Sequence, residues 1–284
     1  MTIFTEQHRD QFQRHGYVKV DAAIPRATVE NVFGALRDAY GLDLEHPSTW
    51  YLLPPENYNI VPLHHSQAQW DNRQQPRLYQ TFCEFWGTDD LWVTMDRIGF
   101  QPPECASHPV LPLHWDMDPR AEQGLVQALI YITDVPEERG PFRGVPSVYA
   151  DLEAWLVERP GAFSFQATDF AQEPTISVPG EAGDLILWHP RLPHGPGRNV
   201  SRLPRVMQPI SMFPAPAADT VEVGGGRWTR QEQIAWWREK RPPPWWRGLK
   251  LQRDPEPGEP ARLTAIGRVL VGLKEQEHDT ASVA

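Results

Sequence analysis

The sequence has few cysteines, no long apolar segment and no surplus of positive charge. Its two cysteines, Cys83 and Cys105, exclude a disulfide framework and a cysteine-rich zinc site, and they favour a reducing compartment. No run of about eighteen apolar residues occurs, so we expect no membrane span. The polar start, residues 1–15, shows no signal peptide, so we expect a cytoplasmic protein. Lys and Arg number 27 against 37 Asp and Glu, a net charge of −10, which makes nucleic acid a poor partner and weakly favours neutral or cationic substrates.

Proline, tryptophan and histidine are abundant instead. The chain of 284 residues contains 30 prolines, 12 tryptophans and 10 histidines. Hydrophobic residues make up 40% of it, which excludes a mostly disordered protein and allows a sizeable buried core. The prolines are spread along the chain, which favours many turns and short strands over long helices. Because cysteines are so few, the histidines become the main supply of metal ligands.

The patterning divides the chain into three parts of a single predicted domain, residues 1–284. A helical part extends to about residue 90, a strand-rich part covers about 91–215, and a helical tail covers about 216–284. The predicted helices cover residues 5–15, 25–40, 76–85, 151–158, 229–240 and 261–274. The predicted strands cover residues 17–20, 91–95, 98–100, 125–132, 184–188 and 205–213. This pattern predicts a mainly β fold, a double sheet with flanking helices.

The sharpest local feature is the tetrapeptide Leu113-His114-Trp115-Asp116. On a strand, residues i and i+2 point to the same face, so His114 and Asp116 can converge on one ion while Trp115 packs the other way. Two histidines and one carboxylate on one side of a metal form the ligand set of non-haem Fe(II) oxygenases. A His-x-Asp tripeptide is also common by chance on a surface strand. The pair therefore needs a second histidine from a distant strand.

Two histidines that follow the predicted strand over 184–188 are candidates for that ligand. His189 and His194 both lie in a turn-rich segment, residues 189–197, whose glycines let the backbone approach a ligand closely. An arginine on the next strand can hold a carboxylate through two parallel hydrogen bonds. The arginines that follow are Arg198, Arg202 and Arg205.

Several more motifs occur in a fixed order along the chain. They are His64-His65, Gln69 to Gln74, Leu91 to Arg97, His114 to Asp118, Val126 to Tyr131, Gly140 to Pro146, and Gly183-Asp184-Leu185 through His194-Gly195 to Arg205. In their order and spacing, over roughly residues 5–215, the chain resembles the phytanoyl-CoA dioxygenase family of Fe(II)/2-oxoglutarate oxygenases. The resemblance implies a double-stranded β-helix core, which is a jelly-roll of the cupin-like kind.

Carried over residue by residue, the resemblance implies an Fe(II) ion bound by His114, Asp116 and His194, which are also the catalytic set. The family's arginine for the co-substrate 2-oxoglutarate falls eleven residues after the distal histidine, and that residue is Arg205 here. Many relatives have a hydroxyl-bearing residue two positions after the distal histidine. This chain has Pro196 there, so that helper is missing.

Five other residues are weaker candidates for the pocket. Gln127 is the lone polar residue of an apolar run, and it either reaches the co-substrate or satisfies a neighbouring strand. Asp118 either contacts a substrate or orients a ligand, or it is a solvated turn residue. Arg97 either forms an internal ion pair or faces the pocket, as Trp92 also can. Of the adjacent histidines, we take His65 to line the substrate cleft.

The resemblance implies an enzyme that uses O2, converts 2-oxoglutarate to succinate and CO2, and oxidises a small-molecule substrate, most commonly by hydroxylation. Related halogenases replace the carboxylate ligand with a small residue, so Asp116 favours hydroxylation or another oxidation over halogenation. Two other functions stay open from the residues alone: a non-catalytic jelly-roll protein that binds a metal or ligand, and a cupin-type metal-dependent isomerase. The tryptophan pairs 236–237 and 245–246 are typical of helix packing, and a homodimer contact there is open as well.

Overall fold

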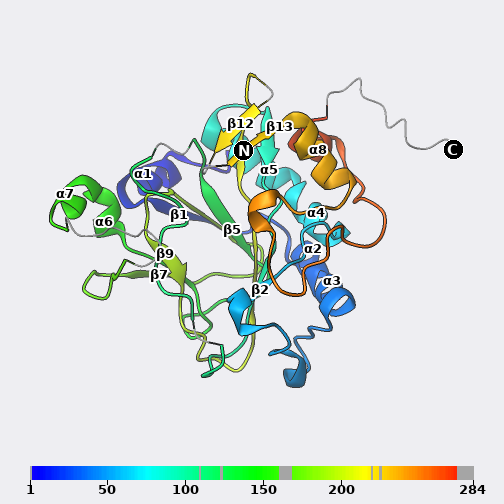
Figure 1. Cartoon of the computed structure of the whole chain (residues 1–284). Coiled ribbons are helices and arrows are strands. Elements are labelled where there is room, and N and C mark those ends of the chain that lie inside the picture. Colours follow the sequence, from blue (N-terminus) through cyan, green and yellow to red (C-terminus); the bar gives the residue numbers. More distant parts are fainter. Residues whose placement is uncertain are drawn as a thin grey trace.

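Short antiparallel strands make up the centre of the protein (Figure 1). The computed structural model describes residues 2–108, 110–121, 124–159, 168–218, 220–223 and 226–273. Its strands are β1 (Tyr17–Val20), β2 (Ile60–Val61), β3 (Leu91–Val93), β4 (Ile98–Gln101), β5 (Gln127–Tyr131), β6 (Phe142–Gly144), β7 (Ile176–Val178), β8 (Leu185–Trp188), β9 (His194–Pro196), β10 (Arg205–Pro209), β11 (Met212–Pro214), β12 (Thr220–Val223) and β13 (Gly226–Thr229).

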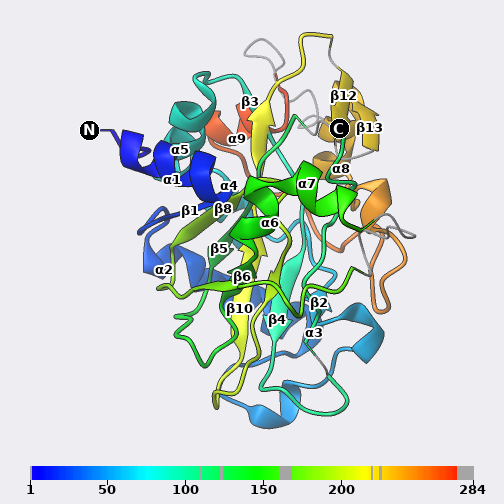
Figure 2. The ribbon, with the colours of Figure 1, turned by 90° about the vertical axis from the view of Figure 1, so that its left-hand side faces the viewer.

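Two facing sheets organise these strands. The major sheet has the order β1-β8-β5-β10-β4-β2, and the minor sheet has the order β7-β6-β9, with antiparallel pairing throughout. In Figure 2, β6 of the minor sheet lies in front of β10 of the major sheet. The remaining strands pair as β11-β3 and β12-β13. This mainly antiparallel arrangement with flanking helices confirms the predicted fold class, a jelly-roll core.

Helices cover the side of the major sheet that faces away from the minor sheet. In Figure 1, α2 to α5 lie on one side of β5, whereas β7 and β9 lie on the other. The α-helices are α1 (Glu6–His15), α2 (Arg26–Val29), α3 (Asn31–Tyr40), α4 (Gln67–Arg73), α5 (Pro76–Trp86), α6 (Pro146–Ala150), α7 (Leu152–Val157), α8 (Arg230–Arg238) and α9 (Ala265–Leu270). Short 3-10 turns are η1 (Pro47–Thr49), η2 (Pro55–Asn57) and η3 (Pro244–Trp246).

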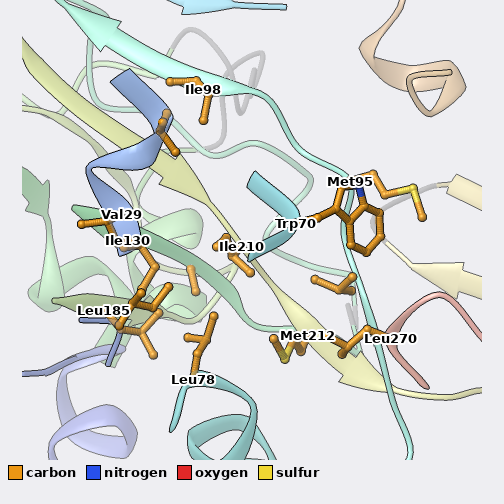
Figure 3. Close-up of a cluster of buried hydrophobic side chains, with 14 of the residues drawn as sticks. Val29, Trp70, Leu78, Met95, Ile98, Ile130, Leu185, Ile210, Met212 and Leu270 are labelled. Carbon is orange, nitrogen blue, oxygen red and sulfur yellow. The ribbon is translucent and has the colours of Figure 1, made fainter. Parts of the chain in front are cut away.

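The two faces of the major sheet bury different side chains. Because alternate residues of a strand point to opposite faces, Ile130 of β5 joins the core beneath the helices, whereas Leu129 and Tyr131 join the core between the sheets. Figure 3 shows the helix-side core, with Val29 of α2 and Leu78 of α5 near Ile130. Each fully buried aliphatic side chain contributes about 1.5–3 kcal/mol. The helices thus cover the outer face, and the inner face packs a second, smaller apolar core against the minor sheet.

Most predicted elements of the first third are confirmed. Thr5 caps α1 through its side chain, and Gly16, with φ +74°, ends the helix in the left-handed conformation. The helix predicted over 25–40 is interrupted at Glu30, which separates α2 from α3. One helix was not predicted: Ser66 begins α4 with a capping box, between the helices predicted over 25–40 and 76–85.

Two predictions in the strand-rich part are wrong in detail. The single strand predicted over 205–213 is divided into β10 and β11, which belong to different sheets. Pro209 has no N–H to continue the ladder, and the N–H of Ser211 donates to the Thr94 hydroxyl instead (3.1 Å). The turn predicted over 189–197 contains the strand β9. Three-residue strands with glycine and proline carry no alternation that a sequence pattern could detect.

The chain after α8 packs back against the first third. Glu256 accepts hydrogen bonds from the backbone N–H groups of His64 (2.5 Å) and His65 (3.0 Å). The helix predicted over 261–274 is shorter, because Thr264 caps α9 and the helix ends at Leu270; position 274 lies outside the described residues. Among the helices that the structure describes, none is both long and apolar enough to cross a bilayer.

Gly183 allows the turn that leads into β8 and so to the second half of the candidate site. Its φ is +100°, and a Cβ atom there would clash with the carbonyl oxygen of Ile24. We expect Gly183→Ala to lower the free energy of unfolding by about 2–4 kcal/mol. Gly34→Ala, inside α3 with no heavy atom within 4 Å of the new methyl group, should raise it by up to about 1 kcal/mol. Urea denaturation followed by circular dichroism measures both, and a Gly183→Ala protein as stable as the wild type would contradict this account.

Glu256 makes stability depend on pH. Burial raises the pKa of its carboxyl to about 7, although the two N–H donors act to lower that pKa. A carboxyl whose pKa is raised on folding stabilises the protein below its unfolded pKa, and this contribution is lost as the pH rises through about 7. The stability advantage of the wild type over Glu256→Gln should therefore shrink by about 2–3 kcal/mol between about pH 5 and about pH 8. Denaturant unfolding of both proteins at the two pH values tests this, and a constant or growing difference would refute it.

Candidate metal centre

Two segments far apart in the sequence are joined by an antiparallel bridge at the candidate site. The His114 N–H donates to the His194 carbonyl and the His194 N–H donates to the His114 carbonyl, each at 2.9 Å. His194 opens β9, and Asp116 follows two residues after His114. The potential ligand atoms of these three side chains all lie within 4.8 Å of one another. Within the described ranges, no other group of three His, Cys, Asp or Glu side chains is so placed.

Backbone carbonyls orient both imidazole rings. Nδ1 of His114 lies 2.8 Å from the Pro112 oxygen, and Nδ1 of His194 lies 3.0 Å from the Leu192 oxygen. Each Nδ1–H therefore donates to a carbonyl, and each Nε2 faces Asp116, at 3.3 Å for His114 and 3.2 Å for His194. Metal-bound histidines are commonly held by such a hydrogen bond from the second ring nitrogen. The donor set thus fits a divalent metal ion.

The carboxylate of Asp116 is the accessible member of the set. Its side chain is 41% exposed, against 15% for His114 and 7% for His194. Burial acts to raise the pKa of Asp116, but hydrogen bonds from the two imidazoles outweigh it and hold that pKa well below its usual range. The ionised form, which is the form that binds metals, is therefore favoured.

A chain of two hydrogen bonds, from Trp188 to Gln127 and from Gln127 to Asp116, positions this carboxylate. Nε2 of Gln127 donates to Oδ2 of Asp116 at 2.6 Å, and Nε1 of Trp188 donates to Oε1 of Gln127 at 3.0 Å. Because the indole N–H can only donate, it fixes the amide with its nitrogen toward Asp116. We predicted that Gln127 reaches the co-substrate or satisfies a strand. Its carbonyl oxygen accepts from Trp188 of the neighbouring strand β8, as the second alternative has it, and a contact with the co-substrate stays a prediction.

Arg205 is a buried cation without an acidic partner. It opens β10, its residue is 4% exposed, and no carboxylate of the described chain lies within ion-pair distance of it. Nη1 donates to Oε1 of Gln101 (3.3 Å), whereas Nε is buried with no hydrogen-bond partner. Burial lowers the pKa of Arg205. A buried charge that lacks a counterion is costly, so an anionic ligand is the partner that this arrangement suits.

Aromatic side chains connect Arg205 with the histidines. The guanidinium lies 5.6 Å from the centre of the Tyr131 ring, and the Tyr131 hydroxyl accepts a hydrogen bond from the Phe142 N–H (2.8 Å). The Phe142 ring stacks on the His194 ring, with 6.0 Å between centres and an interplanar angle of 10°. The triad and Arg205 therefore belong to one interior, between the two sheets.

Comparison with known proteins identifies the family. Residues 12–207 match the sequence profile described as phytanoyl-CoA dioxygenase (PhyH). The chain belongs to this family. A Dictyostelium discoideum protein that carries the provisional name phytanoyl-CoA dioxygenase is 20% identical over 264 residues, which cover 74% of this chain and 76% of that protein.

Solved structures share the fold. The epimerase SnoN, crystallised with Fe3+, alpha ketoglutarate and nogalamycin RO, is 18% identical, with a TM-score of 0.56 over 91% of this chain and 95% of that one. HygX from Streptomyces hygroscopicus, with nickel, 2-oxoglutarate and hygromycin B bound, is also 18% identical, with a TM-score of 0.53 over 74% and 87%. Together with the family, these relatives support an oxygenase-like enzyme that depends on iron and 2-oxoglutarate. Because an epimerase shares the fold, the fold alone does not specify hydroxylation.

Two of the weaker candidates in this family member are deeply buried side chains. We predicted that His65 lines a substrate cleft, but it is 1% exposed, stacks on Trp70 and places Nε2 at 2.8 Å from the Arg241 carbonyl. Trp92 is 3% exposed and belongs to the helix-side core. Both side chains are thus buried in the structure, and a pocket role for either stays a prediction.

Asp118 and Arg97 differ from each other in their surroundings. Asp118 forms an ion pair with Arg120, whose Nε lies 2.8 Å from Oδ1, as expected for the turn interpretation. The Arg97 side chain is 17% exposed and stacks on Trp246, with Cζ 3.2 Å from the ring centre. A substrate role for Arg97 stays a prediction.

Two residues of the site were not predicted from the sequence: Gln101, which contacts Arg205, and Trp188, which contacts Gln127. A signal existed for each. Gln101 follows directly on the predicted strand over 98–100, and Trp188 ends the predicted strand over 184–188. Their partners lie on neighbouring strands, and that pairing register is not readable from one sequence.

The Gln127 relay predicts an effect on metal affinity. Gln127→Met keeps the length of the side chain but removes the donor to Asp116, so we expect Fe(II) to bind about 10–100-fold more weakly. Trp188→Phe, which releases the glutamine carbonyl, should change affinity in the same direction but by less. Competition with a coloured chelator under anaerobic conditions measures both. Gln80→Met, on the exposed surface of α5, is the matched control, and equal affinity for the two glutamine variants would refute the relay.

Proposed function

We propose that the protein is an Fe(II)- and 2-oxoglutarate-dependent dioxygenase that oxidises a small-molecule substrate and releases succinate and CO2. Hydroxylation is the oxidation that we favour. The observation that carries the proposal is the convergence of His114, Asp116 and His194, whose Nε2 and carboxylate atoms face one another. Two imidazoles and one carboxylate on one side of an ion leave its other positions for small ligands. Fe(II), when bound there, supplies the activation of O2 and the oxidising power.

The residues around the triad would hold and orient these groups. The Pro112 and Leu192 carbonyls accept hydrogen bonds from the two Nδ1–H groups and so direct each Nε2 toward the metal position, and the relay through Gln127 keeps one carboxylate oxygen occupied so that the other is presented to the metal. Since Asp116 is retained, the site has the carboxylate that distinguishes hydroxylating relatives from halogenating ones. This is our reason for favouring hydroxylation.

Arg205 would bind the carboxylate of 2-oxoglutarate that lies farther from the metal. Its unpartnered Nε–H and the Nη2–H on the same side of the guanidinium can donate two parallel hydrogen bonds to one carboxylate, while Nη1 stays on Gln101. Gln101 fixes the guanidinium from the side, because its own amide nitrogen donates to the Gly197 carbonyl at 2.9 Å. The hydroxyl that many relatives place beside this carboxylate is replaced by Pro196, so Arg205 would carry this interaction without it.

Location and assembly are proposals too. Cys83 and Cys105 are both free, which fits the reducing cytoplasm that the low cysteine content predicts. A homodimer through the tryptophan-rich C-terminal part stays a prediction, with Trp245 the exposed member at 42%.

A spectroscopic test of this function needs no substrate. Anaerobic addition of Fe(II) and 2-oxoglutarate should produce a weak visible charge-transfer band, and admission of air should then yield succinate. Arg205→Gln should raise the 2-oxoglutarate concentration for half-maximal band formation about 10–100-fold, because a buried charge-assisted pair is lost. It should leave Fe(II) affinity nearly unchanged.

Arg202→Gln is the control, because Arg202 is exposed in the loop before β10. If Arg202→Gln has the larger effect, the co-substrate arginine is misassigned. Absence of both band and succinate would instead favour a non-catalytic binding protein or an isomerase that needs no oxygen.

A further inference from the structure

Arg97 lies on the same face of the major sheet as the co-substrate arginine. Alternate residues of β4 face the interior between the sheets: Gln101 contacts Arg205, and a side chain at Gly99 would contact Met207. Arg97 directly precedes β4 and continues this alternation. Burial lowers its pKa, and the carboxylates of Asp96 and Asp116 oppose that shift, so Arg97 lies within electrostatic reach of the triad.

The guanidinium of Arg97 is fixed by stacking, but its N–H groups lack hydrogen-bond acceptors in the described part of the chain. One face stacks on Trp246, at 3.2 Å, and its nearest charge is Oδ1 of Asp96 at 3.8 Å. None of its N–H groups makes a hydrogen bond to the described part of the chain, and the side chain keeps 17% of its surface exposed. A largely desolvated cation with free donors costs free energy unless an acceptor arrives from outside.

Trp246 comes from a segment beyond the part that matches the family profile, residues 12–207. Its neighbour Trp245 packs against Trp228 and Trp236, with ring centres 4.8 Å and 5.4 Å away, and so anchors η3 above Arg97. The C-terminal part of the chain thus fixes the orientation of a guanidinium that belongs to the jelly-roll. A planar cation fixed in this way is suited to a planar oxyanion, which it can bind through two parallel hydrogen bonds.

We propose that Arg97, held by Trp246, binds a carboxylate or similar oxyanion of the organic substrate, so that the substrate is an anion placed beside the triad. The inference rests on the proposed function for the identity of this ligand as substrate. It reverses the weak preference for neutral or cationic substrates that the net charge of −10 suggested. That charge is an average over the whole surface, whereas the substrate meets the local field of the pocket.

Matched pairs of acid and amide fragments test this proposal. The full chain, loaded with Zn(II) and saturating 2-oxoglutarate, is titrated with benzoate against benzamide and with phenylacetate against phenylacetamide, and binding is followed by ligand-observed NMR. The wild type should bind the acids at least about tenfold more tightly than the amides. Arg97→Gln should abolish this preference, and Arg97→Lys should keep part of it. Arg198→Gln, which removes an exposed arginine paired with Glu104 at 2.6 Å, should leave it unchanged.

Four results overturn the proposal: no binding of either acid, equal binding of acid and amide, a preference that survives in Arg97→Gln, or loss of acid binding when 2-oxoglutarate is added. The last result would make Arg97 part of the co-substrate site. The same titration is repeated without metal and 2-oxoglutarate. An acid preference that depends on Arg97 in a protein that forms no iron–co-substrate band would keep the anion site and reject the oxygenase. A protein that forms the iron–co-substrate band but shows no preference for acids would keep the oxygenase function and reject the anion site.

Discussion

The two backbone hydrogen bonds between His114 and His194 are the contact on which the candidate site depends. They join the segment between β4 and β5 to β9, the edge strand of the minor sheet, and they bring two histidines 80 positions apart within reach of one ion. Side chains alone could not do this, because each imidazole has rotamer freedom that would cost free energy to restrict. The bridge fixes the backbone, and a carbonyl beside each ring then fixes the side chain.

The two faces of the major sheet carry different side chains. The outer face is apolar and is covered by helices, which stabilise the fold without contacting the site. The inner face carries the polar groups: Gln127 toward the carboxylate, Arg205 deeper in the interior, and Arg97 near its edge. Gln127 and Arg205 come from β5 and β10, and Arg97 directly precedes β4, so the hydrogen-bonding register of the sheet sets their separation. A shift of one residue in that register would point them into the helix-side core.

The sequence predicts part of this arrangement well and part of it poorly. Local signals were sufficient for α1, where Thr5 and Gly16 mark both ends. For His114 and Asp116 the two-residue spacing indicated a pair, but the family resemblance was needed to prefer a metal site to a chance His-x-Asp tripeptide. Order along the chain, seen through the family resemblance, was needed to choose His194 over His189. The structure places His189 against Phe12 and Tyr149, away from the triad.

What the sequence could not predict is pairing between distant segments, since three-residue strands such as β9 carry no pattern. Both the burial of His65 by the returning C-terminal segment and the Gln127 relay depend on such pairing. The central claim, that one metal ion is bound by the bridged histidines and Asp116, has a direct measurement: anomalous diffraction at the iron edge from crystals grown anaerobically with Fe(II). The account predicts one strong peak, bonded to Nε2 of both histidines and to a carboxylate oxygen of Asp116. A peak elsewhere, or none at the triad, would contradict it.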